Sequence, residues 1–177
     1  MPYSVMLLRH AQPGDALDIA RVHVRSWQAA YRGLLPDAYL DELRPEDRAQ
    51  KYDFSNPDPK APHTIVAIEA SAICGFATTS ASRDPSFPSH GELCALYVDP
   101  GHWGSGFGVA LVAAARGRLE RLGFQCALLW VLVGNARAER FYRNDGWTPD
   151  GTRRTDTIWG LHVEEMRFLR DLGLQSI

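Results

Sequence analysis

A glycine-rich turn at residues 103–108 is the segment with the clearest capacity for chemistry. Gly104, Gly106 and Gly108 alternate with other residues between an apolar stretch and an alanine- and leucine-rich one. Glycines in a strand-to-helix turn let backbone N–H groups converge on an anion at the positive end of the helix dipole. The spacing favours a phosphate-binding loop, and an ordinary turn is the alternative.

Two common phosphate-binding motifs do not fit this turn. A P-loop requires Gly-Lys-Ser/Thr at its end, whereas Gly108 is followed by Val109 and Ala110. A dinucleotide-binding turn has the pattern G-x-G-x-x-G and an acidic residue about 20 positions later. Here the pattern is G-x-G-x-G, and the next apolar run ends at residues 133–135 (VGN) without a carboxylate. A nucleotide-binding domain of either type is therefore disfavoured.

Two longer stretches resemble the signatures of the GNAT family of N-acetyltransferases. Residues 98–111 (VDPGHWGSGFGVAL) are similar to its acyl-CoA motif, V-x-P-x-x-R/Q-G-x-G-I/F-G-x-x-L. Residues 135–147 (NARAERFYRNDGW) are similar to its second signature, N-x-x-A-x-x-F-Y-x-x-x-G-F. Residues 8–11 with Asp15 resemble its usual first strand and helix start. One position departs from the family, because Trp103 stands where arginine or glutamine usually braces the loop.

The resemblance implies a GNAT acyl-CoA N-acyltransferase fold, in which a single mixed sheet contains a central β-α-β unit and has flanking helices. It also implies an acetyl-CoA-dependent enzyme without a metal, whose sheet opens between residues 92–98 and 125–133 to admit the pantetheine arm. An unpaired strand edge of this kind needs a hydrogen-bonding partner. The implied cofactor contacts are Leu96, Tyr97 and Val98 through their backbone, Trp103, Gly104, Ser105, Gly106, Phe107, Gly108 and Val109 in the turn, and Asn135 and Tyr142.

Acetylation of an amine requires a proton donor for the departing thiolate. Tyr142 occupies the tyrosine of the second signature, and a phenol with a reference pKa of about 10 can protonate a nascent thiolate. Packing beside Phe141 is the alternative role for this ring. Asn135 is a natural helix N-cap, which is compatible with a bond to the pantetheine amide.

The amine must also lose a proton, which requires a base. Glu92 is preferred because it opens the strand that supplies the base in several family members. Regular alternation along that strand would place it on the same face as Cys94, Leu96 and Val98. A solvated carboxylate is the alternative. The weaker candidates for the base are His162, Glu164 and His90.

The acceptor is less well defined than the cofactor. By family analogy the first helices and the loops opposite the cofactor bind it, which makes Trp27, Tyr31 and Trp159 candidate substrate contacts. Aromatic side chains can hold an amine by cation–π contact, although at helical spacing they also serve as core residues. The expected acceptor is a small-molecule amine, a peptide N-terminus or a lysine. A non-catalytic CoA-binding sensor or interaction module is the alternative, because Trp103 is unusual and the base is uncertain.

The elements that position these residues follow from apolar periodicity and turn signals. We predict one α/β domain over residues 1–177. Its predicted strands are 3–9, 64–69, 73–79, 92–98, 125–133, 147–153 and 157–168. Its predicted helices are 16–32 with Asp15 as N-cap, a short one beginning at Pro36, 46–52, 105–122 and 135–144.

Composition narrows the class of partner and the compartment. The net charge is -2, from 19 basic and 21 acidic residues, so neither nucleic acid nor a membrane surface is an expected partner. Cys74, Cys94 and Cys126 lie far apart in apolar surroundings, which predicts reduced core residues. No signal sequence and no apolar run of roughly 20 residues is present, so a cytoplasmic location is expected. Family analogy adds a possible homodimer through edge strands.

Overall fold

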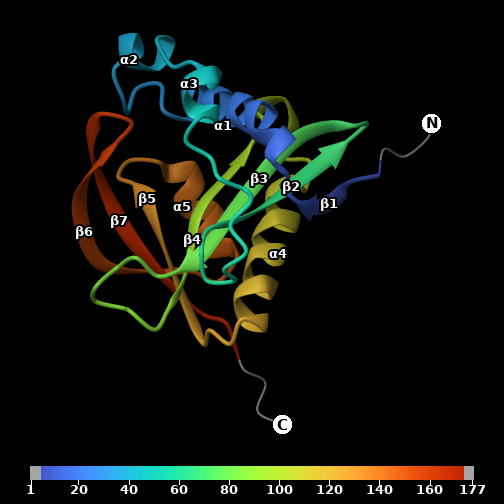
Figure 1. Cartoon of the computed structure of the whole chain (residues 1–177). Helices are drawn as coiled ribbons and strands as arrows, with labels where there is room; N and C mark the ends of the chain where they lie inside the picture. The colour runs from blue at the N-terminus through green and yellow to red at the C-terminus, as the bar shows by residue number, and fades with distance from the viewer. Residues whose placement is uncertain (1–4, 174–177) are drawn as a thin grey trace.

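The computed structural model describes residues 5–173, which form one seven-stranded sheet with helices on both faces (Figure 1). The strands are β1 (Leu7–His10), β2 (His63–Glu69), β3 (Ala72–Ala81), β4 (Gly91–Val98), β5 (Cys126–Leu132), β6 (Thr148–Ile158) and β7 (Leu161–Asp171). The helices are α1 (Ala16–Ala30), α2 (Asp37–Asp41), α3 (Pro45–Ala49), α4 (Phe107–Arg121) and α5 (Ala136–Asn144), with 3-10 turns at Pro13–Asp15 and Pro100–His102.

The sheet has the strand order β1-β2-β3-β4-β5-β7-β6, and β4 and β5 are its parallel pair. Because α4 connects these two strands, the predicted mixed sheet with a central β-α-β unit is confirmed. The pairing of β4 with β5 is limited to Gly91 opposite Ala127 and Glu92 opposite Leu128. Beyond these pairs β5 continues beside β7 alone. The middle of the sheet is therefore open between β4 and β5.

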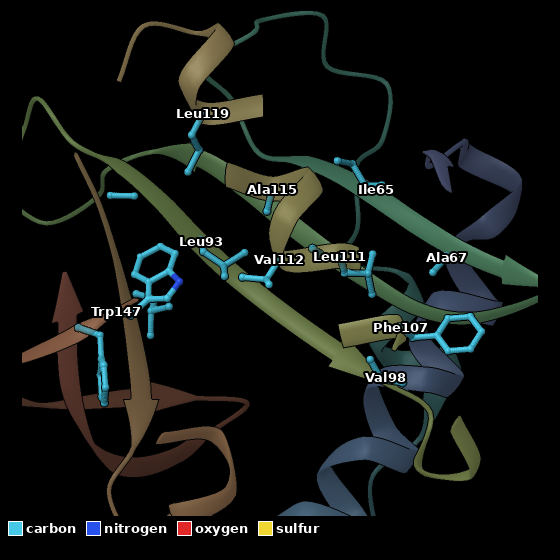
Figure 2. Close-up of a cluster of buried hydrophobic side chains, with 14 of the residues drawn as sticks. Ile65, Ala67, Leu93, Val98, Phe107, Leu111, Val112, Ala115, Leu119 and Trp147 are labelled. Carbon is cyan, nitrogen blue, oxygen red and sulfur yellow. The ribbon is translucent and has the colours of Figure 1, made fainter. Parts of the chain in front are cut away.

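Alternating residues of the strands pack against helices on opposite faces. Val66 and Phe76 pack against Ile19 of α1 on one face. Ile65 and Ala67 belong to the core on the other face, which α4 covers (Figure 2). The buried side chains of α4 recur at helical spacing: Phe107, Leu111, Val112, Ala115 and Leu119. Burial of each large apolar side chain stabilises the fold by about 1.5–3 kcal/mol, so α4 is firmly fixed behind the opening.

Three of the predicted strands have boundaries that are wrong by several residues, and one of these is 147–153, because β6 continues to Ile158. The first strand begins at Leu7 rather than at residue 3, and residues 3 and 4 lie outside the described part of the chain. The predicted strand 157–168 is wrong because Trp159 and Gly160 form a tight turn between β6 and β7. Both have a positive φ, of 49° and 77°. The turn has no cluster of polar turn residues, so the sequence pattern did not indicate that a hairpin turn divides this segment.

The boundaries of the helices differ by a few residues from the prediction. Helix α1 ends at Ala30 instead of residue 32, α3 spans Pro45–Ala49 instead of 46–52, and α4 begins at Phe107. Asp15 is the N-cap residue of α1, but its carboxylate does not cap that helix. It accepts hydrogen bonds from the Gln12 N–H and from Arg9, at 2.7 Å each, because the short turn before α1 brings these donors close.

The three cysteines are free, as predicted, but only Cys74 is fully buried. Cys94 and Cys126 remain partly exposed, so their prediction as core residues is wrong. None of the helices formed by residues 5–173 combines the length and the apolar character that crossing a bilayer requires.

Candidate active site between the parted strands

A cavity of about 750 Å³ occupies the opening between β4 and β5. Residues from α1, the glycine turn, α5 and the β6–β7 hairpin complete its walls. The predicted site residues that line it are Trp27, Tyr31, Glu92, Leu96, Tyr97, Val98, Trp103, Gly104, Gly106, Gly108, Val109, Asn135, Tyr142 and Trp159. The candidate proton donor, base, cofactor loop and acceptor contacts thus share one cavity.

Five predicted or considered residues do not line this cavity. Phe107 is 3% exposed and points into the core under α4, so only its backbone is available to a ligand in the turn. Ser105 is exposed beside the turn. Among the weaker base candidates, His162 and Glu164 are exposed on β7, and His90 packs against Phe87 in the preceding loop.

The backbone of β4 determines which residues can pair with a ligand in the opening. The Asp99 N–H donates to the Cys74 carbonyl of β3 at 2.7 Å. Residues two apart on a strand direct their backbone groups to the same side, so Tyr97 also faces β3. Leu96 and Val98 therefore face the opening. Tyr97 offers the cavity its side chain, and the implied backbone contact at this residue is not supported.

The Val98 carbonyl is already occupied within the protein. It accepts hydrogen bonds from Ser26 Oγ at 2.9 Å and from Trp103 Nε1 at 2.8 Å. A carbonyl oxygen has two lone pairs, so both are used. The groups left for a ligand are the Val98 N–H and the N–H and carbonyl of Leu96.

The glycine turn owes its shape to its backbone angles. Gly104 and Gly106 have φ of 75° and 89°, and Gly106 is the N-cap residue of α4. Gly108 has a different role, because a Cβ there would lie 3.2 Å from the Phe141 ring of α5. The first two glycines shape the loop, and the third allows α4 and α5 to approach closely.

We expect Gly106→Ala to lower the free energy of unfolding by about 1–2 kcal/mol, because an L-residue is strained at positive φ. Urea denaturation followed by circular dichroism measures this change. Gly14→Ala is the matched control, since Gly14 has an ordinary φ and open space around its Cα. Equal stability losses in the two variants would contradict the role assigned to the backbone angle of Gly106.

Trp103 and Arg137 form a unit at the cofactor loop. The Arg137 guanidinium stacks over the Trp103 ring, 3.6 Å from its centroid, while the indole is held by the Val98 carbonyl. Burial lowers the pKa of Arg137. No carboxylate in residues 5–173 forms an ion pair with it, and it lines the cavity. A cation thus stands beside the loop although the loop itself lacks the arginine or glutamine usual at position 103.

The second signature places Asn135 and Tyr142 at opposite ends of α5. Asn135 Oδ1 accepts from the Ala138 N–H at 3.2 Å, so the predicted N-cap is confirmed. Its amide nitrogen remains available to the cavity. The Tyr142 ring packs beside Phe141 and Phe168, and its hydroxyl has no partner in the described part of the chain. Burial raises the pKa of Tyr142, as do nearby Tyr97 and Asp145.

A β-bulge changes which side chains of β4 share a face. Thr78 pairs with Ala95 and Thr79 pairs with Leu93, so Cys94 is an extra residue on β4. Alternation along the strand is interrupted at this point.

Glu92 consequently lies on the face opposite to the one predicted from Leu96 and Val98. Leu93 and Val98 both belong to the core under α4, whereas Tyr97 packs toward α1. Glu92, which neighbours Leu93, therefore faces the α1 side together with the bulged cysteine, whose sulfur is 3.5 Å from its carboxylate. The predicted common face is wrong, but the bulge directs Glu92 into the cavity.

Two buried carboxylates line the cavity, and the sequence pattern found one of them. Glu92 is 2% exposed and accepts a 2.6 Å hydrogen bond from Arg83. Glu165 on β7 is 7% exposed and accepts from Arg154 at 3.1 Å. Burial raises the pKa of Glu165, which Arg154 partly offsets. Alternation with the buried Val163 would have indicated Glu165 once the start of β7 was known.

Aromatic rings form the end of the cavity away from the glycine turn. Trp27 and Trp159 stack with their centroids 4.2 Å apart, and His23 lies 4.4 Å from the Tyr97 ring. His23 Nδ1 is 2.7 Å from the Tyr52 hydroxyl. Burial, and then the charge of a nearby arginine, hold the pKa of His23 well below its usual value. His23 is a site residue that the sequence pattern missed, because a histidine on an apolar helix face carries no distinguishing signal.

Known proteins resemble this chain in sequence. The model of the Acetyltransferase (GNAT) family matches residues 24–147. YuaI of Bacillus subtilis, described as an uncharacterized N-acetyltransferase, is 30% identical over 131 residues, which are 74% of this chain and 74% of that protein.

Solved structures resemble it in fold. The paiA N-acetyltransferase of Thermoplasma acidophilum, in complex with coenzyme A, superposes with a TM-score of 0.70 at 17% identity, over 94% of this chain and 99% of that one. The structure of yncA from Salmonella typhimurium with acetyl-CoA gives a TM-score of 0.68 at 18% identity, over 97% and 96% of the two chains.

Proposed function

Because the chain belongs to the GNAT family of acetyltransferases, we propose that it transfers the acetyl group of acetyl-CoA to a primary amine. The amine nitrogen attacks the thioester carbonyl carbon directly, and the carbon–sulfur bond breaks without a covalent enzyme intermediate. The amine proton passes to a base, and the thiolate receives a proton from an acid. The products are an amide and the free thiol of CoA.

The observation that carries this proposal is the opening in the sheet beside the glycine turn. Leu96 presents an unpaired N–H and carbonyl there, as a strand does to a partner strand, and the pantetheine amides have the complementary groups. The turn and the N-terminus of α4 supply N–H groups for the pyrophosphate. Tyr142 and Glu92 both line the cavity, and we assign them as the acid and the base on either side of the thioester.

Arg137 takes the place of the arginine or glutamine missing at position 103. A cation that lines the cavity and has no ion pair among residues 5–173 is stabilised by an anion, and the cofactor phosphates provide one. The contact with the Trp103 ring holds the Arg137 guanidinium at the loop before the cofactor binds.

We expect Arg137→Gln to raise the Kd for acetyl-CoA about tenfold, since hydrogen bonds to charged groups contribute at least this much. Titration calorimetry measures the effect. Arg140→Gln is the matched control, because Arg140 is exposed on the same helix and does not line the cavity. An equal change in both variants would mean that general charge, rather than this contact, sets the affinity.

The acetyltransferase proposal is tested with a panel of amines, including polyamines, amino acids and peptides. Release of the CoA thiol from acetyl-CoA, detected colorimetrically, reports turnover with each acceptor. Tight binding of acetyl-CoA without turnover on any amine would contradict catalysis and favour a cofactor sensor or interaction module. We further propose a cytoplasmic location, and a homodimer on family analogy alone.

A further inference from the structure

Four arginines line the cavity, and two of them form ion pairs with buried glutamates whereas the other two form none among residues 5–173. Arg83 pairs with Glu92, and Arg154 pairs with Glu165, so these charges are balanced within the protein. Arg137 stands at the cofactor loop. Arg48, at the aromatic end, is the remaining one.

Arg48 has no anionic partner in the part of the chain that the structure describes. Its Nε atom is buried without a hydrogen-bond partner among residues 5–173, and its guanidinium forms no ion pair there. It lies over the Trp159 ring at 4.5 Å and the Tyr52 ring at 5.3 Å. These rings attract a cation but do not supply a negative charge. Neighbouring His23 is neutral, because its pKa is well below the usual value.

The hairpin turn places Trp159 over Arg48 in a strained backbone conformation. Its φ of 49° is one that bulky L-residues rarely adopt. The Tyr39 hydroxyl of α2 donates to the Trp159 carbonyl at 2.9 Å, and Trp27 stacks on the indole. Several elements therefore cooperate to keep an aromatic wall against an unpaired cation inside the cavity.

We infer that the acceptor carries a carboxylate, or a similarly small oxyanion, beside its amine, and that Arg48 binds this group. This inference rests on the proposed acetyl transfer. A guanidinium binds a carboxylate through two parallel hydrogen bonds, which would balance the unpaired charge of Arg48 and fix the orientation of the acceptor. The aromatic wall then packs against the side chain of an amino acid. A polyamine would instead bring a second positive charge toward Arg48.

Matched acceptors test the inference directly. For phenylalanine and methionine, the free amino acid is compared with its amide and with the amine that lacks the carboxylate. We expect the amino acid to have a kcat/KM at least about tenfold above the other two, because one charged contact is lost in each. Arg48→Gln removes this difference, and Arg48→Lys, which keeps the charge and most of the packing, retains part of it.

Arg44→Gln is the control, because Arg44 is exposed at the start of the same short helix and does not line the cavity. It should keep the wild-type preference. Amides or simple amines that react as well as the amino acids with the wild-type protein would overturn the inference.

A binding measurement separates this inference from the proposed function. N-acetylated phenylalanine and its amide are titrated calorimetrically into the protein saturated with CoA. If the carboxylate binds more tightly than the amide, and Arg48→Gln loses this difference, the anion site is supported. Absence of turnover with every amine would then contradict the proposed catalysis but not the anion site. Equal binding of the two compounds would remove Arg48 as an anion site.

Discussion

Tyr142→Phe is expected to lower kcat about 100-fold, the lower end of the range for loss of a general acid or base. The loss should be at this end because a thiolate is a stable leaving group compared with an alkoxide or an amide anion. The substitution keeps the ring against Phe141 and Phe168, so the packing of α5 is preserved. The hydroxyl, which has no partner in the described residues, is the only group removed.

The raised pKa of Tyr142 gives this prediction a pH dependence. A phenol whose pKa lies above its ordinary value of about 10 stays protonated throughout the neutral range. It is therefore always ready to donate, and its ionisation should cause no loss of activity below about pH 10. Wild type and variant should differ by a constant factor across the neutral range.

Steady-state kinetics and calorimetry together check the assignment. We expect the Kd for acetyl-CoA and the melting temperature of Tyr142→Phe to stay close to wild type while kcat falls. An unchanged kcat would remove Tyr142 as the proton donor. A Kd that rises in proportion to the loss of activity would make its hydroxyl a cofactor contact instead.

Local patterns in the sequence were sufficient for the cofactor end of the site. The glycines of the turn and the capping role of Asn135 depend on residues within a few positions, and both lie in the cavity. The strand from Gly91 to Val98 was also predicted closely. Its bulge at Cys94 was not, because nothing in the local apolar pattern distinguishes a regular strand from one with an extra residue.

Features that depend on distant contacts were missed. Arg137 meets Trp103 only because α4 and α5 pack on the same face of the sheet. Glu165 is not indicated by the sequence, because the predicted strand 157–168 runs through the turn at Trp159 and Gly160 and conceals the start of β7. Arg48 lies on a short helix with little apolar periodicity, and its position over Trp159 is set by the packing of α2 and α3 against the hairpin.

The two buried carboxylates lead to the second large effect. We expect Glu92→Gln to lower kcat/KM about 100-fold at neutral pH, because the amide keeps the shape of the side chain but cannot accept the amine proton. Glu165→Gln should cost less than about tenfold. Both side chains belong to one charged network, since Arg83 binds Glu92 and also influences the pKa of Glu165.

The pH profile distinguishes the two carboxylates. Burial raises the pKa of Glu165, so this group ionises at a higher pH than a solvated glutamate. If Glu165 were the base, wild-type activity would increase as the pH rises through that raised pKa, and Glu165→Gln would abolish the increase. If Glu92 is the base, Glu165→Gln keeps the pH dependence of the wild-type protein, and only Glu92→Gln causes the large loss of activity.

Glu164→Gln provides the matched control for this pair of variants. Glu164 precedes Glu165 on β7, but its side chain is exposed and pairs with Arg153 outside the cavity. A surface ion pair contributes little, so turnover should remain within about twofold of wild type. A larger loss in Glu165→Gln than in Glu92→Gln would transfer the role of base to β7. Near-wild-type activity of both cavity variants would exclude the two buried carboxylates as the base.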